Sequence, residues 1–352
     1  MNRVRTALWL SLFLIAISLL VGCMANNDGP DPKLEDKLVD RIVFFSDSGN
    51  GSQIYMISPE GKDLATIQFN LPSGVKISGL QWSKAAQRWA FSGVTSSSAD
   101  IYIASLDGKT VQNITDSAGY FTDGPAFSPD GKRIAYIVSE GGQNTAVATS
   151  LIDGSSVNRV SKMPTMETSP VWLPDNNHLL IFSSKEGSPN IFKASIDGSL
   201  LVNLSKGPGL DNDLSVADNG LIFVFISDRA HGKNLFAYDL KTDQISQLTT
   251  DIGNIYSPKI SPDGTKVVFR AEKDGSDLFV LDLANKSTTQ LTHTPKIVQQ
   301  DISWSPDSQN ILYSADNQGQ KDVFLIDLTG KITNLTNRPS NDYGATWIRV
   351  LP

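Results

Sequence analysis

One unit of about 44 residues recurs from residue 41 to the C-terminus, and it limits the fold more than any other feature. Its clearest column has members 43 to 45 residues apart: Trp82, Phe127, Trp172, Val216, Ile260, Trp304 and Trp347. A second column lies at Phe45, Phe91, Tyr136, Ile181, Phe225, Phe269 and Tyr313. A third lies at Tyr55, Tyr102, Ala148, Phe192, Phe236, Phe279 and Phe324. A fixed period of this length is typical of solenoids and propellers.

Turn signals separate the apolar runs within each unit. The sequence Ser-Pro-Asp-Gly, or a close variant, recurs at residues 128–131, 261–264 and 305–308. Proline presets one turn dihedral, aspartate bonds to nearby backbone and glycine accepts a positive φ, so these are tight turns between antiparallel strands. We assign a structural role to the aspartates at this turn position: Asp130, Asp175, Asp263 and Asp307.

Four short strands per unit predict an all-β fold, a β-propeller of seven four-stranded blades. The chain enters the repeat at a second strand, near residues 41–47, and ends on a first-strand motif at residues 345–348. We therefore expect the C-terminal strand to pair with the N-terminal blade and to close the ring, which removes an open sheet edge. The column tryptophans are expected to pack between blades rather than to hold a ligand.

The best-preserved unit places Trp304-Ser305-Pro306-Asp307 before apolar runs at residues 311–314 and 322–327 and a closing Leu335-Thr336 pair. This pattern resembles the repeat of the TolB-like β-propeller family, known as PD40, and the resemblance covers residues 41 to 350. That family is usually described as six-bladed, so six blades is the alternative count. Its additional N-terminal α/β domain has no room in this chain, and the role of TolB in an envelope complex is not transferred.

The N-terminal segment has the pattern of an export signal. Arg3 and Arg5 precede an apolar stretch from residue 7 to residue 21, which is short for a membrane span but suits a secretory signal. The stretch ends in Leu20-Val21-Gly22-Cys23, which resembles a bacterial lipobox. We predict a lipoprotein signal peptide over 1–22, a flexible tether over 23–38 that begins at lipidated Cys23, and a TolB-like propeller over 39–352.

The anchor prediction also sets a location. Resemblance to bacterial lipoproteins implies a multiply acylated cysteine, which holds a protein stably on a membrane. We expect an exported, membrane-anchored protein that faces the periplasm or the cell exterior. Met24 follows the cysteine where an aspartate would favour the inner membrane, so the outer membrane is favoured in a Gram-negative host.

Resemblance to the TolB-like repeat implies an acidic residue at the start of each innermost strand. The sequence matches at Asp123, Glu167, Asp211 and Asp342 and departs at Ile77, Ile255 and Gln299. Two interpretations stay open. The carboxylates either cap turns and bond to neighbouring backbone, or they form an acidic mouth of the central channel that binds a cation or a basic peptide.

The sequence offers no pattern of catalytic residues. Its three histidines, His178, His231 and His293, occupy different positions in the repeat and are not expected to converge on a metal. No Gly-x-Ser-x-Gly elbow is present, and lipidation would consume Cys23, the single cysteine. The net charge of −7 becomes about −9 without the first 22 residues, which argues against a nucleic-acid partner.

These observations predict a monomeric, non-catalytic scaffold that binds a protein or glycan of the cell envelope and needs no cofactor, with metal binding left open. The alternative is an enzyme of the envelope, a glycan-acting lyase or hydrolase that uses acidic residues at the propeller channel. The alternative requires clustered carboxylates with shifted pKa values.

Overall fold

The computed structural model describes residues 37–47, 52–116, 121–139, 144–161, 167–273, 275–293 and 300–352, without the side chains of residues 167–169 and 317. The predicted signal segment, Cys23 and residues 24–36 of the predicted tether lie outside these ranges. The described ranges contain 28 strands, so the prediction of an all-β fold is confirmed. They contain no helical segment with the length and apolar character of a membrane span.

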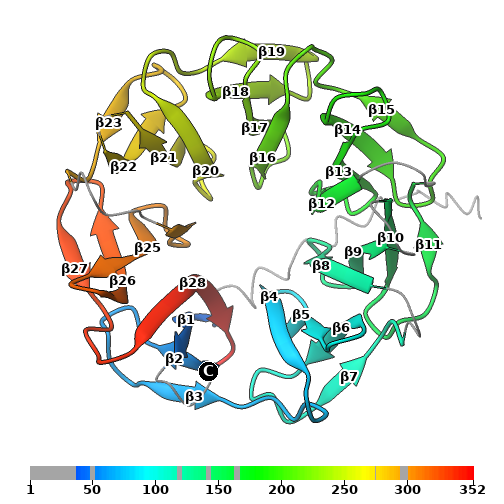
Figure 1. Cartoon of the computed structure of the whole chain (residues 1–352), viewed down its shortest axis with the longest axis vertical. Coiled ribbons are helices and arrows are strands. Elements are labelled where there is room, and N and C mark those ends of the chain that lie inside the picture. The colour runs from blue at the N-terminus through cyan, green and yellow to red at the C-terminus, as the bar shows by residue number, and fades with distance from the viewer. Residues whose placement is uncertain are drawn as a thin grey trace, which may run out of the picture.

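The strands form seven sets of four around a central axis (Figure 1). The first set combines both ends of the chain: β28 (Asn341–Val350), β1 (Val39–Asp47), β2 (Ser52–Ile57) and β3 (Ala65–Ile67). The next two sets are β4 (Lys76–Ser83), β5 (Arg88–Val94), β6 (Ala99–Ala104), β7 (Val111–Asn113), and β8 (Phe121–Phe127), β9 (Arg133–Ser139), β10 (Thr145–Leu151), β11 (Asn158–Arg159). A single parallel bridge, Ala99 to Phe121, joins these two sets into one eight-stranded sheet.

Four further sets continue the order around the axis. They are β12 (Glu167–Trp172), β13 (His178–Ser183), β14 (Asn190–Ser195), β15 (Leu201–Asn203), and β16 (Asp211–Val216), β17 (Ile222–Ser227), β18 (Asn234–Asp239), β19 (Gln244–Gln247). The last two are β20 (Asn254–Ile260), β21 (Lys266–Glu272), β22 (Ser276–Asp282), β23 (Thr288–Gln290), and β24 (Gln300–Trp304), β25 (Asn310–Asn317), β26 (Gln320–Asp327), β27 (Ile332–Asn334). Within each set, neighbouring strands are antiparallel.

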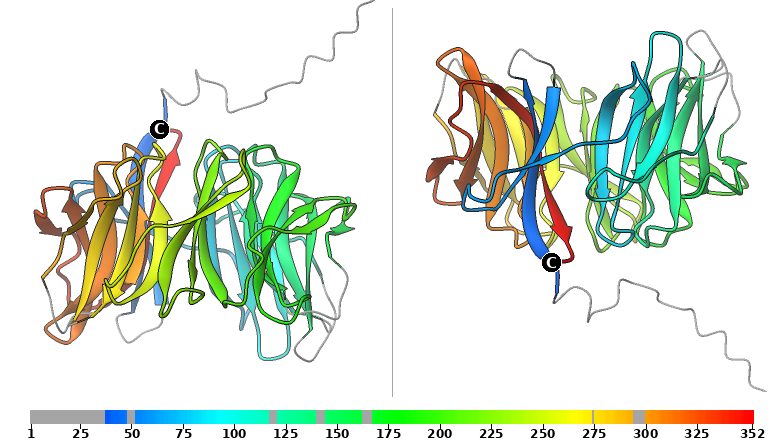
Figure 2. Two further views of the ribbon diagram at one scale, coloured as in Figure 1. Left: turned by 90° about the horizontal axis from the view of Figure 1, so that it is seen from above. Right: turned by 90° about the horizontal axis from the view of Figure 1, so that it is seen from below.

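The first and last strands of the described chain lie side by side. β28 pairs with β1 from Val39 opposite Val350 to Asp47 opposite Asn341. Both ends therefore emerge together at one face of the ring (Figure 2). This face also carries the turns between the first and second strands of the other six sets, the Ser-Pro-Asp-Gly turns among them, and we call it the turn face. The opposite face, called the loop face, carries the hairpins between second and third strands and the connections between sets.

The core lies between neighbouring sets. One buried cluster, for example, joins Val224 and Leu235 of one set to Val267 and Phe269 of the next. Residues of the second and third columns face each other across paired strands, and where both are aromatic the rings stack, as Phe225 does on Phe236 at 5.8 Å between ring centroids. Burial against the adjacent set removes apolar surface that one sheet could not hide alone.

The second column needs one correction. Phe44, not Phe45, lies opposite Tyr55, stacks on it at 5.8 Å and is completely buried. Phe45 points to the other side of β1 and stacks on Tyr343. Two adjacent phenylalanines fit the repeat equally well in the sequence, and only the register of β1 with β2 decides between them.

The column tryptophans contribute to the core between sets, as predicted, and three of them also bond across a boundary. Trp172 donates from Nε1 to the carbonyl of Ala126 at 2.8 Å, and Trp304 donates to that of Lys259 at 2.9 Å. Trp82 likewise donates to Arg349 at 3.0 Å. Trp347 differs, because its buried Nε1 atom has no partner among the described residues.

The turn aspartates hold their turns, as expected. Asp263 accepts hydrogen bonds from the Ser261 hydroxyl and from the backbone N–H of Thr265. Asp130 makes the corresponding bonds with Ser128 and with Lys132. Each turn is therefore closed by its own side chains, which leaves these carboxylates to a structural role.

Candidate functional site

A cavity of about 1160 Å³ occupies the centre of the ring, and all seven innermost strands contribute to its wall. We call it the channel. Each innermost strand contains one extra residue relative to its partner, a β-bulge, and at this position the backbone is left-handed in every described case: Gly79, Gly124, Asp213, Ser257, Asp301 and Gly344. Glycine adopts this conformation without strain and aspartate tolerates it, which explains five of these six residues; Ser257 is the exception.

Two bulge residues bring carboxylates to the channel. Asp301 accepts hydrogen bonds from the Ser314 hydroxyl at 2.5 Å and from the Gly344 backbone N–H at 2.8 Å. Asp213 lies near the Ser257 backbone N–H, at 3.4 Å. Lys259 is open to the channel, but enclosure by the wall lowers the pKa of its ammonium group, and the Asp213 carboxylate opposes this effect. The channel therefore carries both signs of charge.

Two of the four predicted acidic residues are buried in ion pairs. Asp211 has no exposed side-chain surface and accepts hydrogen bonds from Arg229 Nη2 at 2.8 and 3.0 Å. Asp342 is equally buried and binds Arg338, with Nη2 at 3.0 Å and Nε at 3.3 Å. Each arginine also lies over the stacked aromatic pair of the set to which its aspartate belongs. These contacts give both carboxylates structural partners.

The other two predicted acidic residues, Glu167 and Asp123, lie near the starts of their innermost strands, on the loop face. Glu167 is the first residue of β12, and its side chain lies outside the described part of the structure. Asp123 is exposed and accepts a hydrogen bond of 2.6 Å from the Ser92 hydroxyl. The strand register corrects its place in the repeat. Buried Thr122, which pairs with Val138, is the residue equivalent to Asp211, which pairs with Ser227. Asp123 therefore lies one position beyond the acidic column.

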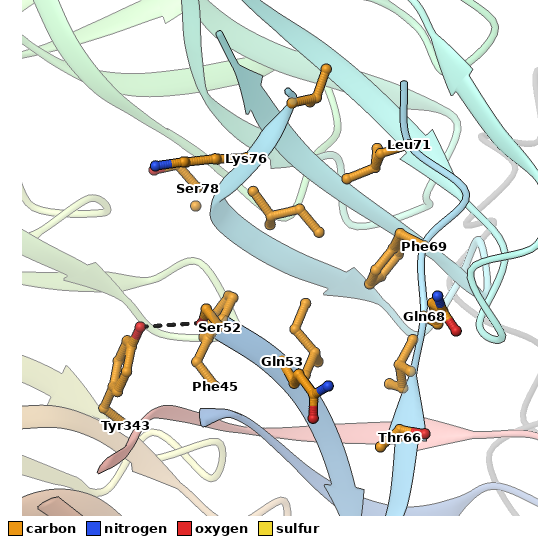
Figure 3. A pocket seen from close by; sticks show the side chains of 15 residues that line it. Phe45, Ser52, Gln53, Thr66, Gln68, Phe69, Leu71, Lys76, Ser78 and Tyr343 are labelled. Atoms are coloured by element: carbon orange, nitrogen blue, oxygen red, sulfur yellow. Dashed lines mark hydrogen bonds between the residues drawn. The ribbon is translucent and has the colours of Figure 1, made fainter. Parts of the chain in front are cut away.

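A second cavity opens at the loop face, between the β28–β1–β2–β3 set and β4 (Figure 3). We call it the side pocket; its volume is about 810 Å³. Its wall is formed by Phe45, Ile54, Ile67, Phe69, Leu71, Val75, Ile77, Gly79 and Tyr343, with Ser52, Gln53, Thr66, Gln68, Lys76 and Ser78 as polar groups. The Ser52 and Tyr343 hydroxyls lie 3.4 Å apart at one end.

Neither the bulge residues nor the side pocket was predicted from the sequence. A signal for the bulges was available, since the position three residues before the first column holds only glycine, serine or aspartate. No comparable signal predicts the side pocket, because its wall forms only where two adjacent strand sets pack together and β28 brings Tyr343 from the other end of the sequence.

The histidines occupy separate places, as expected. His178 bonds through Nδ1 to Asp175 at 2.6 Å on the turn face, and His293 borders a small cavity with Asp251 and Asp277. Within the described ranges, no group of three or more histidine, cysteine or acidic side chains is arranged to hold a metal ion.

Comparisons with known proteins agree with this architecture. The family model of the TolB β-propeller domain, PD40, matches residues 71–254 and 225–349. The Tol-Pal system protein TolB of Francisella tularensis subsp. mediasiatica (strain FSC147) is 24% identical over 234 residues, which cover 64% of this chain and 53% of that protein. The chain thus spans about half the length of the curated relatives it matches.

Solved structures share the fold at low identity. TolB from Acinetobacter baumannii is 17% identical, with a TM-score of 0.54, over 87% of this chain and 82% of that one. An oligogalacturonate lyase from Vibrio parahaemolyticus is 12% identical, with a TM-score of 0.68, over 85% of this chain and 89% of that one. These likenesses concern the fold alone. The family model, in contrast, covers most of the repeat region, and the chain therefore belongs to the TolB β-propeller domain family.

Proposed function

We propose that this protein is an exported, lipid-anchored propeller whose loop face binds a protein of the bacterial envelope without catalysis. The observation that carries the proposal is the separation of the two faces. Both described chain ends lie at the turn face, while the side pocket opens at the loop face; the channel wall reaches both faces and includes Leu210 and Asp211 at the loop face. Relatives in the same family bear the name Tol-Pal system protein TolB, which supports an envelope partner.

The anchor would orient the ring. Cys23 would be acylated after removal of residues 1–22, and residues 24–38 would span at most about 50 Å when extended. Because the described chain begins at the turn face, this tether would hold the turn face toward the membrane and the loop face away from it. In a Gram-negative host the membrane would be the outer one, and the protein would act as a monomer.

The channel mouth offers a surface for such a partner. Phe121 of β8 and Leu210, directly before β16, are 45% and 51% exposed. Exposed apolar side chains near an opening are a common feature of protein-binding sites. The carboxylates of Asp123, Asp213 and Asp301 would receive a basic side chain of the partner, with Glu167 nearby on β12, while Asp211 and Asp342 would hold the surrounding strands.

Matched photo-crosslinking positions test the proposal in living cells. A photoreactive amino acid replaces Leu210 at the loop face or Leu221, which is 56% exposed at the turn face. We expect a discrete protein adduct from position 210 and none from position 221. Capture from position 221 alone would contradict the assigned face. Absence of adducts from both, together with glycan cleavage by the purified protein, would instead support the enzymatic alternative.

The anchor has its own test. We expect Cys23→Ala to abolish incorporation of radiolabelled fatty acid and to reduce capture from position 210. Fatty-acid labelling that persists in this variant would show that Cys23 is not the acylated residue.

A further inference from the structure

Six of the seven strand sets share a polar network that closes the loop-face end of the set. In each, a serine or threonine hydroxyl after the fourth strand accepts a hydrogen bond from the backbone N–H near the start of the third strand: Thr115 from Ile101, Ser161 from Val147, Ser205 from Ile191, Thr249 from Leu235, Thr292 from Leu278 and Thr336 from Val323. In five of them, this hydroxyl also bonds to an aspartate or asparagine side chain. The network satisfies buried polar groups within the set.

The described residues of the set that contains the chain ends form no such network. Strand pairing places Thr66 opposite Tyr55 as Asn113 lies opposite Tyr102, so Gln68 occupies the position of the closing hydroxyl. Gln53 correspondingly occupies the position of the aspartate or asparagine. Both glutamines are exposed and border the side pocket.

Neighbouring residues depart from the repeat in the same place. Ile77 stands where Asp211 and Asp342 begin their strands, so this boundary has no buried ion pair of that kind. Phe45 faces away from the aromatic column and stacks on Tyr343 instead. Phe69, in the connection to β4, packs edge-on against Phe91 at 5.2 Å. Departures from an otherwise regular repeat are expected at functional positions.

Together these changes build a cavity with a defined chemistry. An apolar wall lies beside two exposed glutamine amides. The Gln68 amide offers a donor and an acceptor, whereas Gln53 Oε1 already accepts a hydrogen bond from the Tyr55 hydroxyl at 2.8 Å and the Gln53 amide offers its N–H groups. Lys76 is the one charged residue among the described residues of the lining. Its ammonium group and the Gln68 amide form no hydrogen bond or ion pair with other described residues. Pockets of 300 to 1,000 Å³ with an apolar wall and a few polar groups are typical of small-molecule sites.

We propose that the side pocket binds a small amphipathic anion. An aromatic or branched apolar group would lie against Phe45, Phe69 and Ile77, polar groups would bond to Gln53 and Gln68, and a carboxylate would pair with Lys76. The site is separate from the channel mouth, and the proposal does not depend on a protein partner there. The same chemistry belongs to free organic acids and to the C-terminal residue of a peptide, which the experiment distinguishes.

The probes are N-dansyl-phenylalanine and its amide, which lacks the negative charge. Their fluorescence anisotropy is followed as the full-length chain is added in a nonionic detergent. We expect saturable binding of the acid, about five-fold tighter than that of the amide, because an exposed ion pair contributes little more than this. Lys76→Gln should abolish the difference, whereas Lys62→Gln, an exposed lysine of the same set on the turn face, should preserve it.

Two further variants test the cavity itself. Ile77→Asp places a carboxylate in the apolar wall, and Ser78→Tyr fills the space; each should weaken binding of both probes roughly ten-fold or more. Thermal unfolding identifies a variant that has lost its fold, and the other variant then decides the test. Absence of saturable binding by the natural chain, or binding that is unchanged in the folded pocket variants, would overturn the proposal.

Competition identifies the source of the anion. A pentapeptide that ends in phenylalanine with a free carboxylate is compared with its amidated form. Displacement of the dansyl acid by the free peptide alone supports a polypeptide C-terminus as the ligand. Retention of the dansyl acid in the presence of both peptides supports a free organic acid.

Discussion

Arg229 and Asp211 form a buried ion pair in which one guanidinium nitrogen lies 2.8 and 3.0 Å from the two carboxylate oxygens. The guanidinium carbon also lies 5.2 and 5.4 Å from the ring centroids of Phe225 and Phe236. Arg338 and Asp342 repeat this arrangement with an arginine from a different loop. Arginines from two different positions in the repeat thus make the same contact with an aspartate and an aromatic pair. This indicates that the contact matters for the packing of these sets.

Removal of one partner of this ion pair should destabilise the protein. We expect Asp211→Ala to lower the free energy of unfolding by about 3 kcal/mol, because Arg229 would keep its charge in a site with little water. Asp211→Ala combined with Arg229→Met should cost less than the sum of the single changes. Chemical denaturation gives these values. Lys109→Ala, at an ion pair whose side chains are 79% and 54% exposed, is the control and should change stability by less than about 0.5 kcal/mol.

The indole N–H groups of the first-column tryptophans should contribute differently to the free energy of unfolding. Trp304→Phe removes a hydrogen bond to the Lys259 carbonyl, whereas Trp347→Phe removes a donor that has no described partner. We expect Trp304→Phe to destabilise the protein by about 1 kcal/mol more than Trp347→Phe does. Urea denaturation of both variants measures the difference. Equal losses would show that ring packing alone accounts for the effect of both residues.

Restoration of the repeat's polar network at the side pocket should raise the stability of the protein and weaken ligand binding. Gln53→Asp with Gln68→Thr rebuilds the network seen, for example, at Asp277 and Thr292. We expect a rise in the midpoint of thermal unfolding, since a buried hydroxyl would bond to the backbone of β2. Affinity for the dansyl acid should fall in the same variant. Thr292→Val, which deletes the network in a set without the side pocket, should lower stability and leave that affinity unchanged.

Asp197 should titrate far below an ordinary aspartate. The Ser195 hydroxyl and then the Ser199 backbone N–H donate to its carboxylate, which lowers its pKa to about 2 from 3.8. Because the folded-state pKa is the lower one, the stabilisation from this turn is complete above about pH 3.8 and is lost as the pH falls toward 2.

Carboxyl ¹³C NMR tests this titration. Ser195→Ala should raise the pKa of Asp197 toward its ordinary value, because the strongest hydrogen bond is lost. Asp107 provides the reference in the same spectrum, since Ser105 and Lys109 hold its pKa at about 2 and remain intact. A parallel shift of both aspartates would contradict a local origin.

Two residues were assigned one position away from their true place in the repeat, for the same physical reason. The repeat predicted the strands and turns, yet it placed Phe45 and Asp123 one position from their equivalents. Side chains alternate between the two faces of a strand, so a shift of one residue reverses the face. The bulge in each innermost strand adds one residue, and the period alone cannot locate it, although the residue types at this position mark it.

The sequence by itself determined the all-β class, the strand order and the turns, because these follow from local apolar periodicity and from residues with restricted backbone dihedrals. It also predicted that the last strand, which carries Trp347, belongs with the first. Only the tertiary structure decided which carboxylates pair with an arginine and which reach the channel. Asp211 is neutralised by an arginine 18 residues away, while Asp301 reaches the channel through a bulge. Charge pairing and cavities depend on distances between segments that are remote in the sequence, and these distances exist only in the closed packing of the sets.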